Sequence, residues 1–317
     1  MIKNETVFPN RQSDLFLTDG GLETTLVFLH GIDLPNFAAF PLLNDSRGYA
    51  TISEYYINYL EIAKKYKTSF ILESPTWRSN PNWLKKMGYE DSALTTINAK
   101  AIQLMNELKA TYIDSIPSIL ISGCIGPEGD GYKPDHRMSV KEARDYHSKQ
   151  VGIFKNLSID MVSAITMNYV EEALGITLAA NDADLPVVIS FTVETNGKLV
   201  TGTSLKEAIE EVDAKAMNAP LYYMINCSHP SHFMNELETG DKTWLDRIGG
   251  IRSNASAKSH GELDESTELD SGDPSALAKE TQQIRNLFNH INVFGGCCGT
   301  DERHIEEMAR LLQTHRS

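Results

Sequence analysis

Two neighbouring cysteines, Cys297 and Cys298, follow two glycines in the stretch "NVFGGCCGTDERHI" at 292–305. Adjacent cysteines rarely bridge each other because the disulfide between them would be strained. A third cysteine, Cys227, lies in "INCSHP" at 225–230. Three thiolates with one open position describe a zinc site that binds a substrate, since zinc prefers soft sulfur ligands in a tetrahedral arrangement. The glycines beside the pair would let the backbone turn so that both cysteines reach one ion.

A zinc ion with three thiolate ligands would favour one kind of reaction. Its net negative charge makes it a poor Lewis acid toward water, but an incoming thiol would still lose its proton on binding. The bound sulfur would stay electron-rich enough to attack an alkyl carbon. Such a site favours alkyl transfer to sulfur over hydrolysis.

The cysteine spacing alone is equally compatible with burial. Free cysteine is among the residues most often found in protein cores, and the chain has no CxxC pair. Cys124 stands apart from the others and is expected in the core or in a pocket wall. His229 and His232 could compete as metal ligands, but Pro230 between them indicates a turn from a loop into a helix.

The composition is that of an ordinary globular protein. The chain has 317 residues, of which 41% are hydrophobic and 23% charged, and its mean hydropathy is -0.29. A formal charge of -14 and a pI near 5.1 argue against nucleic acid or an anionic membrane as a partner. No apolar run is long enough to cross a bilayer, and the N-terminus lacks the apolar centre of a secretory signal.

The cysteine content predicts a reducing, cytoplasmic setting. Four cysteines in a chain of this length form no disulfide framework, so they are expected to be free thiols or metal ligands. The expected partners are small molecules. The acidic surface is compatible with a monomer or a homo-oligomer.

Short apolar runs, many of them β-branched, alternate with segments of helical period along the whole chain. The runs cover 15–20, 69–74, 118–123, 161–166, 186–194, 221–227, 247–254 and 291–296. Helices are predicted over 53–66, 139–157 and 204–217. Their N-caps would be Ser53, Ser139 and Ser204, and Glu207 would complete a capping box with the last of these.

Eight strand candidates alternating with helices predict an α/β fold, a (β/α)8 TIM barrel that forms a single domain over 1–317. An open doubly wound sheet is the structural alternative, but its usual cofactor fingerprint is missing. The glycines of "GPEGDG" at 126–131 have the wrong order for a dinucleotide or methyl-donor loop, and no P-loop motif occurs.

In a (β/α)8 barrel the functional residues gather at the C-terminal ends of the strands. The predicted strands end at or run into Asp19-Gly20-Gly21, Glu73, Gly123-Cys124, Thr166, Glu194, Asn226-Cys227, Asn254 and Gly295-Gly296-Cys297-Cys298. Three of the four cysteines therefore fall at one rim, on the sixth and eighth strands. These strands are not adjacent, but closure of the barrel would bring their ends to the same mouth.

Four motifs occur in one order along nearly the whole chain. They are "LTDGGLETTL" (17–26), "GPEGDGY" (126–132), "INCSHP" (225–230) and "GGCCGTDERHI" (295–305). With these motifs the chain resembles the homocysteine S-methyltransferase family, whose members are zinc-dependent (β/α)8 barrels.

The resemblance implies roles for several residues of these four motifs. It implies that Cys227 and the 297–298 pair are the zinc ligands. It also implies that Asp19, with the backbone of Gly20 and Gly21, holds the amino-acid end of the thiol substrate. The alternative is that these last three residues only form a tight turn.

The chain departs from the family at the end of the fourth strand. Family members usually carry a glutamate there that helps to bind the substrate's amino group, whereas this chain has Ile165 and Thr166. Thr166 is the substrate-binding residue predicted at this place; it can accept a hydrogen bond but carries no charge. The acids at 171–172 are expected to begin the next helix, and Glu73 or Glu194 could offer a carboxylate or be ordinary rim acids. This departure leaves the acceptor open between homocysteine and a related thiol.

A second departure is the acidic segment "NASAKSHGELDESTELDSGD" at 254–273. It is expected to be a solvated loop, with a lid over the site as the alternative. Trp77, Trp83 and Tyr132 could form an aromatic wall for a cationic methyl donor, or could pack in the core.

These features together predict a zinc-dependent S-methyltransferase with no catalytic residue beyond the metal site. A small sulfonium or quaternary ammonium donor would give its methyl group to homocysteine, forming methionine in amino-acid metabolism, or to a related thiol. Two alternatives remain. One is a non-catalytic barrel that binds zinc for stability or sensing, and the other is a thiol redox enzyme with two cysteines able to form a disulfide.

Overall fold

The computed structural model describes residues 8–9, 14–134, 136–264 and 266–313. Eight parallel strands in this part of the chain close into a barrel in sequential order, with β1 paired to both β2 and β8. The strands are β1 (Phe16–Leu17), β2 (Ser69–Glu73), β3 (Ile119–Ile125), β4 (Met161–Met167), β5 (Val187–Phe191), β6 (Tyr223–Ser228), β7 (Ile248–Ser253) and β8 (Val293–Gly296). Each coincides with one of the predicted apolar runs, so the predicted single-domain (β/α)8 fold is confirmed.

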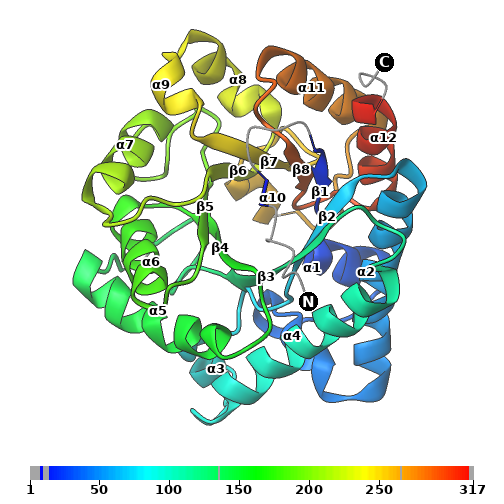
Figure 1. Ribbon diagram of the computed structural model, residues 1–317, viewed down its shortest axis with the longest axis vertical. Helices are drawn as coiled ribbons and strands as arrows, with labels where there is room; N and C mark the ends of the chain where they lie inside the picture. The colour runs from blue at the N-terminus through cyan, green and yellow to red at the C-terminus, as the bar shows by residue number, and fades with distance from the viewer. Residues whose placement is uncertain (1–7, 10–13, 135, 265, 314–317) are drawn as a thin grey trace, which may run out of the picture.

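Helices surround the barrel as an outer ring (Figure 1). The longer ones are α2 (Ser46–Tyr66), α4 (Ala93–Tyr112), α5 (Val140–Lys155), α6 (Val170–Asp182), α7 (Leu205–Lys215), α8 (Pro230–Thr239), α11 (Pro274–Leu287) and α12 (Glu302–Gln313). The shorter ones are α1 (Leu22–Thr24), η1 (Thr25–Leu29), η2 (Pro35–Phe37), η3 (Phe40–Asn44), α3 (Pro81–Lys86), α9 (Lys242–Leu245) and α10 (His260–Asp264). The last helix, α12, packs against both α11 and α2 and so covers the seam between the two ends of the barrel. Among the described residues, none of the helices combines the length and the apolar character that a membrane span needs.

Two of the three predicted helix caps are confirmed and one is wrong. Ser139 and Ser204 cap α5 and α7, each in a capping box with the glutamate three residues further on. Ser53 lies in the interior of α2, because this helix begins earlier with Asp45 as its cap. The Asp45 carboxylate accepts hydrogen bonds from two backbone N–H groups of the first turn at 3.0 and 2.9 Å. A carboxylate at this place also faces the positive end of the helix dipole.

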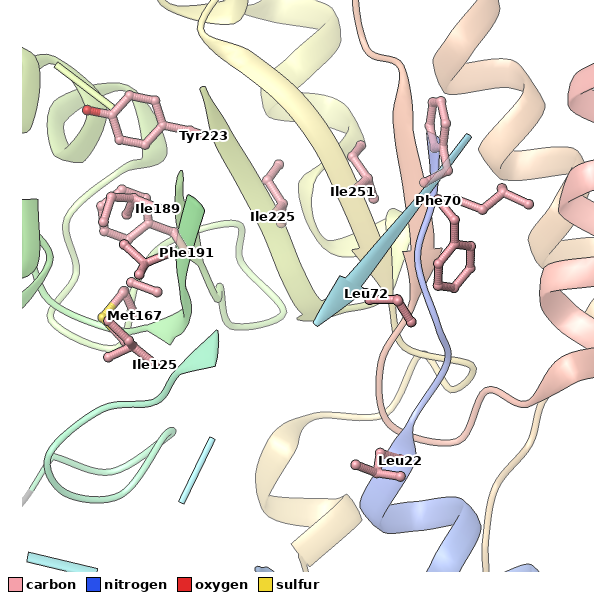
Figure 2. Close-up of a cluster of buried hydrophobic side chains, with 14 of the residues drawn as sticks. Leu22, Phe70, Leu72, Ile125, Met167, Ile189, Phe191, Tyr223, Ile225 and Ile251 are labelled. Carbon is pink, nitrogen blue, oxygen red and sulfur yellow. The ribbon is translucent and has the colours of Figure 1, made fainter. Parts of the chain in front are cut away.

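Side chains alternate along each strand between the barrel interior and the surrounding helices. Figure 2 shows part of the outer set, in which Phe70, Leu72, Ile225 and Ile251 belong to the large core cluster. A second cluster, built from the alternate strand positions, fills the interior of the barrel. It includes Phe16, Ile71, Leu120, Met161, Val188, Tyr222, Met224 and Val293.

The interior of the barrel becomes polar toward the C-terminal ends of the strands. The next inward positions along the strands are buried polar or charged residues, namely Glu73, Ser122, Ser163, Ser190, Asn226 and Arg252. The strands themselves therefore form a polar floor under the mouth of the barrel, where functional residues of this fold gather.

Candidate metal and substrate site

The sulfur atoms of Cys227, Cys297 and Cys298 lie within 4.8 Å of one another at the mouth of the barrel. Cys227 is part of β6, and the other two cysteines directly follow β8. The intervening strand, β7, pairs with both β6 and β8, and this pairing brings the two strand ends together. The structure thus unites three residues that are distant in the sequence.

Cys227 and Cys297 are joined by a disulfide in this structure. The expectation that all cysteines are free thiols or metal ligands is wrong for this pair. The physical reason is the barrel geometry, which places the Cα atoms of the two residues 5.3 Å apart, within the range that a disulfide spans. The Sγ atom of Cys298 lies 4.0 Å from that of Cys227. Thiolates rather than disulfide sulfurs bind metal ions, so this pair must be reduced before the three cysteines can share an ion.

The backbone of Cys227 is held in the left-handed region, with φ at 53°. Its carbonyl oxygen accepts hydrogen bonds from Asn254 Nδ2 at 3.0 Å and from His260 Nε2 at 2.6 Å. Both donors belong to the segment that follows β7. Backbone strain of this kind persists where the surroundings determine the conformation, and here two side chains fix the direction in which the Cys227 sulfur points.

The glycines around the cysteine pair have two different roles. A Cβ atom on Gly295 would lie 1.8 Å from Thr18 Oγ1, and one on Gly296 would lie 1.9 Å from Thr300 Oγ1. These two glycines allow close packing rather than a turn, contrary to the sequence interpretation. Gly299, with φ at 81°, supplies the turn after the pair.

Asp19 lies beyond the end of β1, and its carboxylate is bound by protein groups. Oδ1 accepts a hydrogen bond from Arg252 Nη2 at 2.6 Å, and Oδ2 accepts one from Tyr55 OH at 3.1 Å. Arg252 also donates from Nε to the carbonyl oxygen of Gly296 at 3.1 Å. Sequence reasoning missed Arg252. An arginine within an apolar run can point into the barrel or toward the helices, and the strand register is needed to decide between them.

Gly20 and Gly21 pack closely against neighbouring groups at the mouth of the barrel. A Cβ atom on Gly20 would lie 2.7 Å from Tyr59 OH, and one on Gly21 would lie 2.6 Å from the carbonyl oxygen of Cys297. The N–H of Gly21 donates to the carbonyl oxygen of Thr300 at 3.0 Å. The two glycines therefore fit the first strand against the cysteine loop.

Thr166, near the end of β4, is bonded to Asn226 through both its backbone and its side chain. Asn226 Nδ2 donates to Thr166 Oγ1 at 2.8 Å, and Thr166 N donates to Asn226 Oδ1 at 2.9 Å. Thr166 has φ at 67°, and the pairing of β4 with β5 shifts register around it. Asn226 Nδ2 also lies 3.9 Å from Cys297 Sγ. Thr166 therefore orients an amide beside the cysteines, a role that the sequence did not indicate.

Glu73 lines the cavity at the mouth of the barrel. The other acids considered as substitutes for a glutamate on the fourth strand do not line it. Its side chain is 4% exposed, and its Oε2 has no hydrogen-bond partner in the described part of the chain. Burial raises the pKa of Glu73 to about 7. Glu172 is instead buried in a pair with His147, with Oε1 and Nε2 2.9 Å apart, and Glu194 is partly exposed.

A cavity of about 540 Å³ opens at the C-terminal face of the barrel and connects the predicted site residues. Its lining includes Asp19, Gly20, Gly21, Glu73, Cys124, Thr166, Cys227, Cys297 and Cys298. Trp77, Trp83 and Tyr132 line it as well, and Trp77 also packs against the cluster inside the barrel.

Two further charged residues of the cavity, Glu23 and Arg78, were missed by sequence reasoning. Glu23 belongs to α1, directly after the double glycine. Burial raises the pKa of Glu23 to about 7, and the nearby Asp19 acts in the same direction. Neither residue lies in a predicted strand, so the alternation of the strands gave no sign of their position.

The two histidines weighed as metal ligands have other partners. His229 caps α8 and accepts a hydrogen bond from the N–H of Ser231. His232 Nε2 lies 2.9 Å from the carbonyl oxygen of Ala257, to which it donates. Neither belongs to the cluster of three cysteines.

The acidic segment 254–273 covers part of the cavity. The expectation of a solvated loop holds for part of the segment, since Lys258, Glu262 and Thr267 are exposed. Other residues of the segment agree with the alternative of a cover, because they line the cavity. The segment lines the cavity with His260, Leu263, Ser266, Glu268, Leu269 and Asp270. Its helix α10 lies within the ring of outer helices in Figure 1. The ring centroids of His260 and Tyr132 are 4.2 Å apart, and this contact joins the cover to the loop that follows β3.

Comparisons with known proteins agree with this fold. The sequence matches the homocysteine S-methyltransferase family over residues 16–312. The fold is similar to that of the homocysteine methyltransferase MmuM from Escherichia coli in its oxidized form, with a TM-score of 0.73 and 18% identity, covering 94% of this chain and 96% of that one. The metallated form gives a TM-score of 0.68 at 17% identity, with coverage of 94% and 96%. The apo form gives 0.66 at 16%, with coverage of 95% and 97%. A search of curated protein sequences found no significant match.

The fold and the family match define a (β/α)8-barrel methyltransferase. The chain belongs to the homocysteine S-methyltransferase family.

Proposed function

We propose that this protein is a zinc-dependent S-methyltransferase formed by residues 1–317 as one domain. It moves a methyl group from a small sulfonium or quaternary ammonium donor to the thiol of homocysteine, giving methionine, or to a related thiol. The observation that carries the proposal is the set of three cysteine sulfurs within 4.8 Å of one another in the wall of a cavity. Family membership favours this function over a non-catalytic barrel or a thiol redox enzyme.

Cys227, Cys297 and Cys298, once reduced, would hold the metal ion. Three soft sulfur donors from one mouth fit zinc, and the adjoining cavity leaves room for a fourth ligand. A bound zinc ion would lower the pKa of a thiol placed beside it and keep its sulfur nucleophilic at neutral pH. The hydrogen bonds of Asn254 and His260 to the Cys227 carbonyl hold that ligand in place without metal.

The cavity lining supports binding of an amino-acid thiol. Asp19, Gly20, Gly21 and Thr166 are the proposed substrate-binding residues, and all four line the cavity. We add Glu73, whose buried Oε2 has no partner in the described part of the chain. A substrate ammonium group would satisfy this oxygen and would favour the ionised carboxylate. Glu73 would thereby supply the negative charge that Thr166 lacks.

The aromatic wall supports a cationic methyl donor. Trp77 and Tyr132 line the cavity, and aromatic rings attract onium groups. The bond from the methyl carbon to the positive sulfur or nitrogen breaks as the new carbon–sulfur bond forms. The donor leaves as a neutral thioether or amine, and the proton of the acceptor thiol passes to solvent. The barrel contributes alignment of the two substrates and exclusion of water.

The test compares cysteine variants after reduction of the protein with a dithiol under argon. Wild type should bind about one zinc per chain, measured by elemental analysis and by competition with a chromophoric chelator, and should methylate homocysteine. Cys227→Ala and Cys298→Ala should lose zinc affinity at least about 10-fold and lose activity. Cys124→Ala is the matched control, because this buried cysteine lies outside the cluster of three. Zinc content and turnover of wild-type level in the Cys227→Ala and Cys298→Ala proteins would contradict the proposal.

A further inference from the structure

The segment that follows β7 is bonded to the backbone of the cysteine cluster. Its first part, residues 254–263, is the cover segment. His260 Nε2 donates to the carbonyl oxygen of Cys227 at 2.6 Å, and Ala255 N donates to that of Cys298 at 3.0 Å. The cover segment therefore binds a cysteine of β6 and a cysteine that follows β8 at the same time.

His260 is placed by the local sequence "SHGE" at 259–262. This stretch forms a capping box, in which Ser259 N donates to Glu262 Oε2 at 2.9 Å and Glu262 N donates to Ser259 Oγ at 3.3 Å. The reciprocal bonds begin α10 at His260, which is 6% exposed. Because its partner on Cys227 is a carbonyl oxygen, His260 Nε2 carries the hydrogen.

The imidazole ring of His260 also contacts residues that follow other strands. Its centroid lies 4.2 Å from that of Tyr132 in the loop after β3, and Tyr132 OH lies 4.0 Å from Cys298 Sγ. Its Nδ1 lies 3.5 Å from Glu194 Oε1 in the loop after β5. His260 therefore meets the barrel at the ends of β3, β5 and β6.

Polar bonds rather than apolar packing hold the cover segment against the barrel. Among residues 254–263, Ala255 is the one apolar side chain that is buried, and Leu263 is half-buried. Lys258 and Glu262 are exposed. A segment with so few buried apolar contacts opens at a low cost in free energy, so its few polar bonds decide how often it is docked.

Asn254 bonds the same carbonyl oxygen as His260 but belongs with the barrel. It directly follows β7, and its N–H donates to the carbonyl oxygen of Ser228 at 3.2 Å. Asn254 can therefore stay in place when the rest of the cover segment moves. His260 is the side-chain contact with Cys227 that forms and breaks with the cover segment.

The conformation of Cys227 links this contact to the three sulfurs. Its φ of 53° is a left-handed value, which residues other than glycine adopt at a cost in free energy. The bond from His260 offsets part of this cost. A change of the backbone dihedrals that turns the carbonyl away from His260 also redirects Sγ of the same residue. Docking of the cover segment and convergence of the three sulfurs therefore favour each other.

We propose that His260 is a positioning residue that couples docking of the cover segment to metal binding by the three cysteines. A metal ion held by the cysteines stabilises the docked segment, and the docked segment raises the metal affinity by the same factor, because coupling between two sites is reciprocal. The inference rests on the metal site of the proposed function. It adds that the metal-loaded protein keeps the cavity covered, whereas the reduced, metal-free protein opens it more often.

The experiment measures backbone hydrogen exchange by mass spectrometry in protein reduced with a dithiol under argon, with and without zinc. Reduction is needed because the disulfide holds Cys227 against Cys297 without metal. In wild type, zinc should slow exchange of the N–H groups of residues 255–263 at least about fivefold. Helix α5, which packs against α4 and α6, is the internal standard and should exchange at the same rate in both samples.

Two substitutions separate the hydrogen bond of His260 from its ring contact. His260→Phe keeps an aromatic ring beside Tyr132 but cannot donate to the Cys227 carbonyl. It should weaken zinc affinity roughly 10-fold, measured by competition with a chromophoric chelator. It should also reduce the slowing by zinc to less than about twofold. His260→Gln keeps an N–H donor and should recover part of both effects, and wild-type exchange in α5 shows that both variants are folded.

Lys258→Gln is the matched control within the cover segment. Lys258 Nζ lies 3.1 Å from Asp270 Oδ2 in an exposed ion pair that does not involve the cysteines. This variant should keep zinc affinity and the slowing by zinc within about twofold of wild type, since exposed ion pairs contribute little. Exchange in wild type that does not respond to zinc would overturn the proposal. Weaker zinc binding in His260→Phe with the full slowing retained would assign His260 to local support of Cys227, with the same consequence.

Neither measurement uses a methyl donor or an acceptor thiol, so the coupling and the reaction are tested separately. Zinc-dependent slowing that requires His260, in a protein that transfers no methyl group, would retain the coupling and reject the reaction. Methyl transfer by a protein whose cover segment exchanges at the same rate with and without zinc would reject the coupling alone.

Discussion

Three buried charged residues of the cavity differ in how the protein balances their charge. Arg252 is paired with Asp19 at 2.6 Å, whereas Arg78 and Glu73 have no ion pair within the described residues. A buried charge without a partner raises the free energy of the folded state, and a carboxyl group can avoid this cost by keeping its proton. Glu73 avoids the cost in this way, because burial raises its pKa to about 7 and the carboxyl group keeps its proton below that pH. The residue therefore makes the stability of the ligand-free barrel depend on pH.

The Glu73→Gln variant tests this dependence. Between pH 4.5 and about 7 the folded protein keeps the Glu73 proton that the unfolded chain has lost. The free energy of unfolding therefore falls as pH rises through this window and levels off above it. The variant should lack this contribution, so its stability relative to wild type should rise by on the order of 3 kcal/mol from pH 4.5 to 7. Urea unfolding at a series of pH values measures it.

Glu54→Gln is the control for the Glu73 variant, because Glu54 is exposed on α2. Its difference from wild type gives the baseline for removing a surface carboxylate, against which the Glu73→Gln difference is compared. A Glu73→Gln difference that follows this baseline would show that the Glu73 carboxyl is not perturbed by burial.

At the scale of elements, the first residue of a helix and the packing of a loop depend on polar side chains. The spacing of apolar residues does not predict these side-chain contacts. The periodicity of α2 is compatible with a start at either Asp45 or Ser53, since both residue types are good caps. The structure selects Asp45, which bonds two N–H groups of the first turn. The segment 254–273 is polar in sequence but packs over the cavity, because His260 bonds the Cys227 carbonyl and stacks near Tyr132. Tertiary contacts decide both cases.

The cap of α2 can be tested by paired substitutions. Asp45→Ala should lower the free energy of unfolding by about 1 kcal/mol, because two helix N–H groups lose their acceptor. Ser53→Ala should change it by less than about 0.5 kcal/mol, since Ser53 makes no cap. Thermal and urea unfolding of both variants measure the difference. An equal loss in the two variants would place the start of α2 elsewhere.

For the whole molecule, the sequence was most informative about topology and least about register. Buried parallel strands are continuous apolar runs, so all eight strands could be located. The ring order then placed Cys227 near Cys298, because strand ends meet at one mouth. The inward positions of Glu73 and Arg252, the bonding of Thr166 to Asn226 and the Cys227–Cys297 disulfide depend on distances of a few ångströms. Such distances follow from the closed barrel and not from spacing in the chain.

Closure of the barrel depends on the tight seam between β1 and β8. Gly295→Ala should destabilise the protein by about 2 kcal/mol, because the added Cβ would overlap Thr18 Oγ1 across this seam. Gly152→Ala in α5 is the control, since no atom lies within 4 Å of a Cβ at that position. It should raise stability by roughly 0.5–1 kcal/mol through helix propensity. Denaturant unfolding gives both values, and a Gly295→Ala protein as stable as wild type would mean that the seam is loose.

The mutual bonding of Thr166 and Asn226 limits which substitutions the end of β4 could accept during evolution. A glutamate at 166 would restore an acid at the end of the fourth strand, but it would remove the hydroxyl that receives Asn226 Nδ2. It would also place a longer side chain at a left-handed position, which few residues other than glycine and asparagine tolerate. Because Asn226 directly precedes Cys227, the substitution would also disturb the cluster of three cysteines. An ancestral or laboratory path between the two forms therefore requires paired changes at 166 and 226.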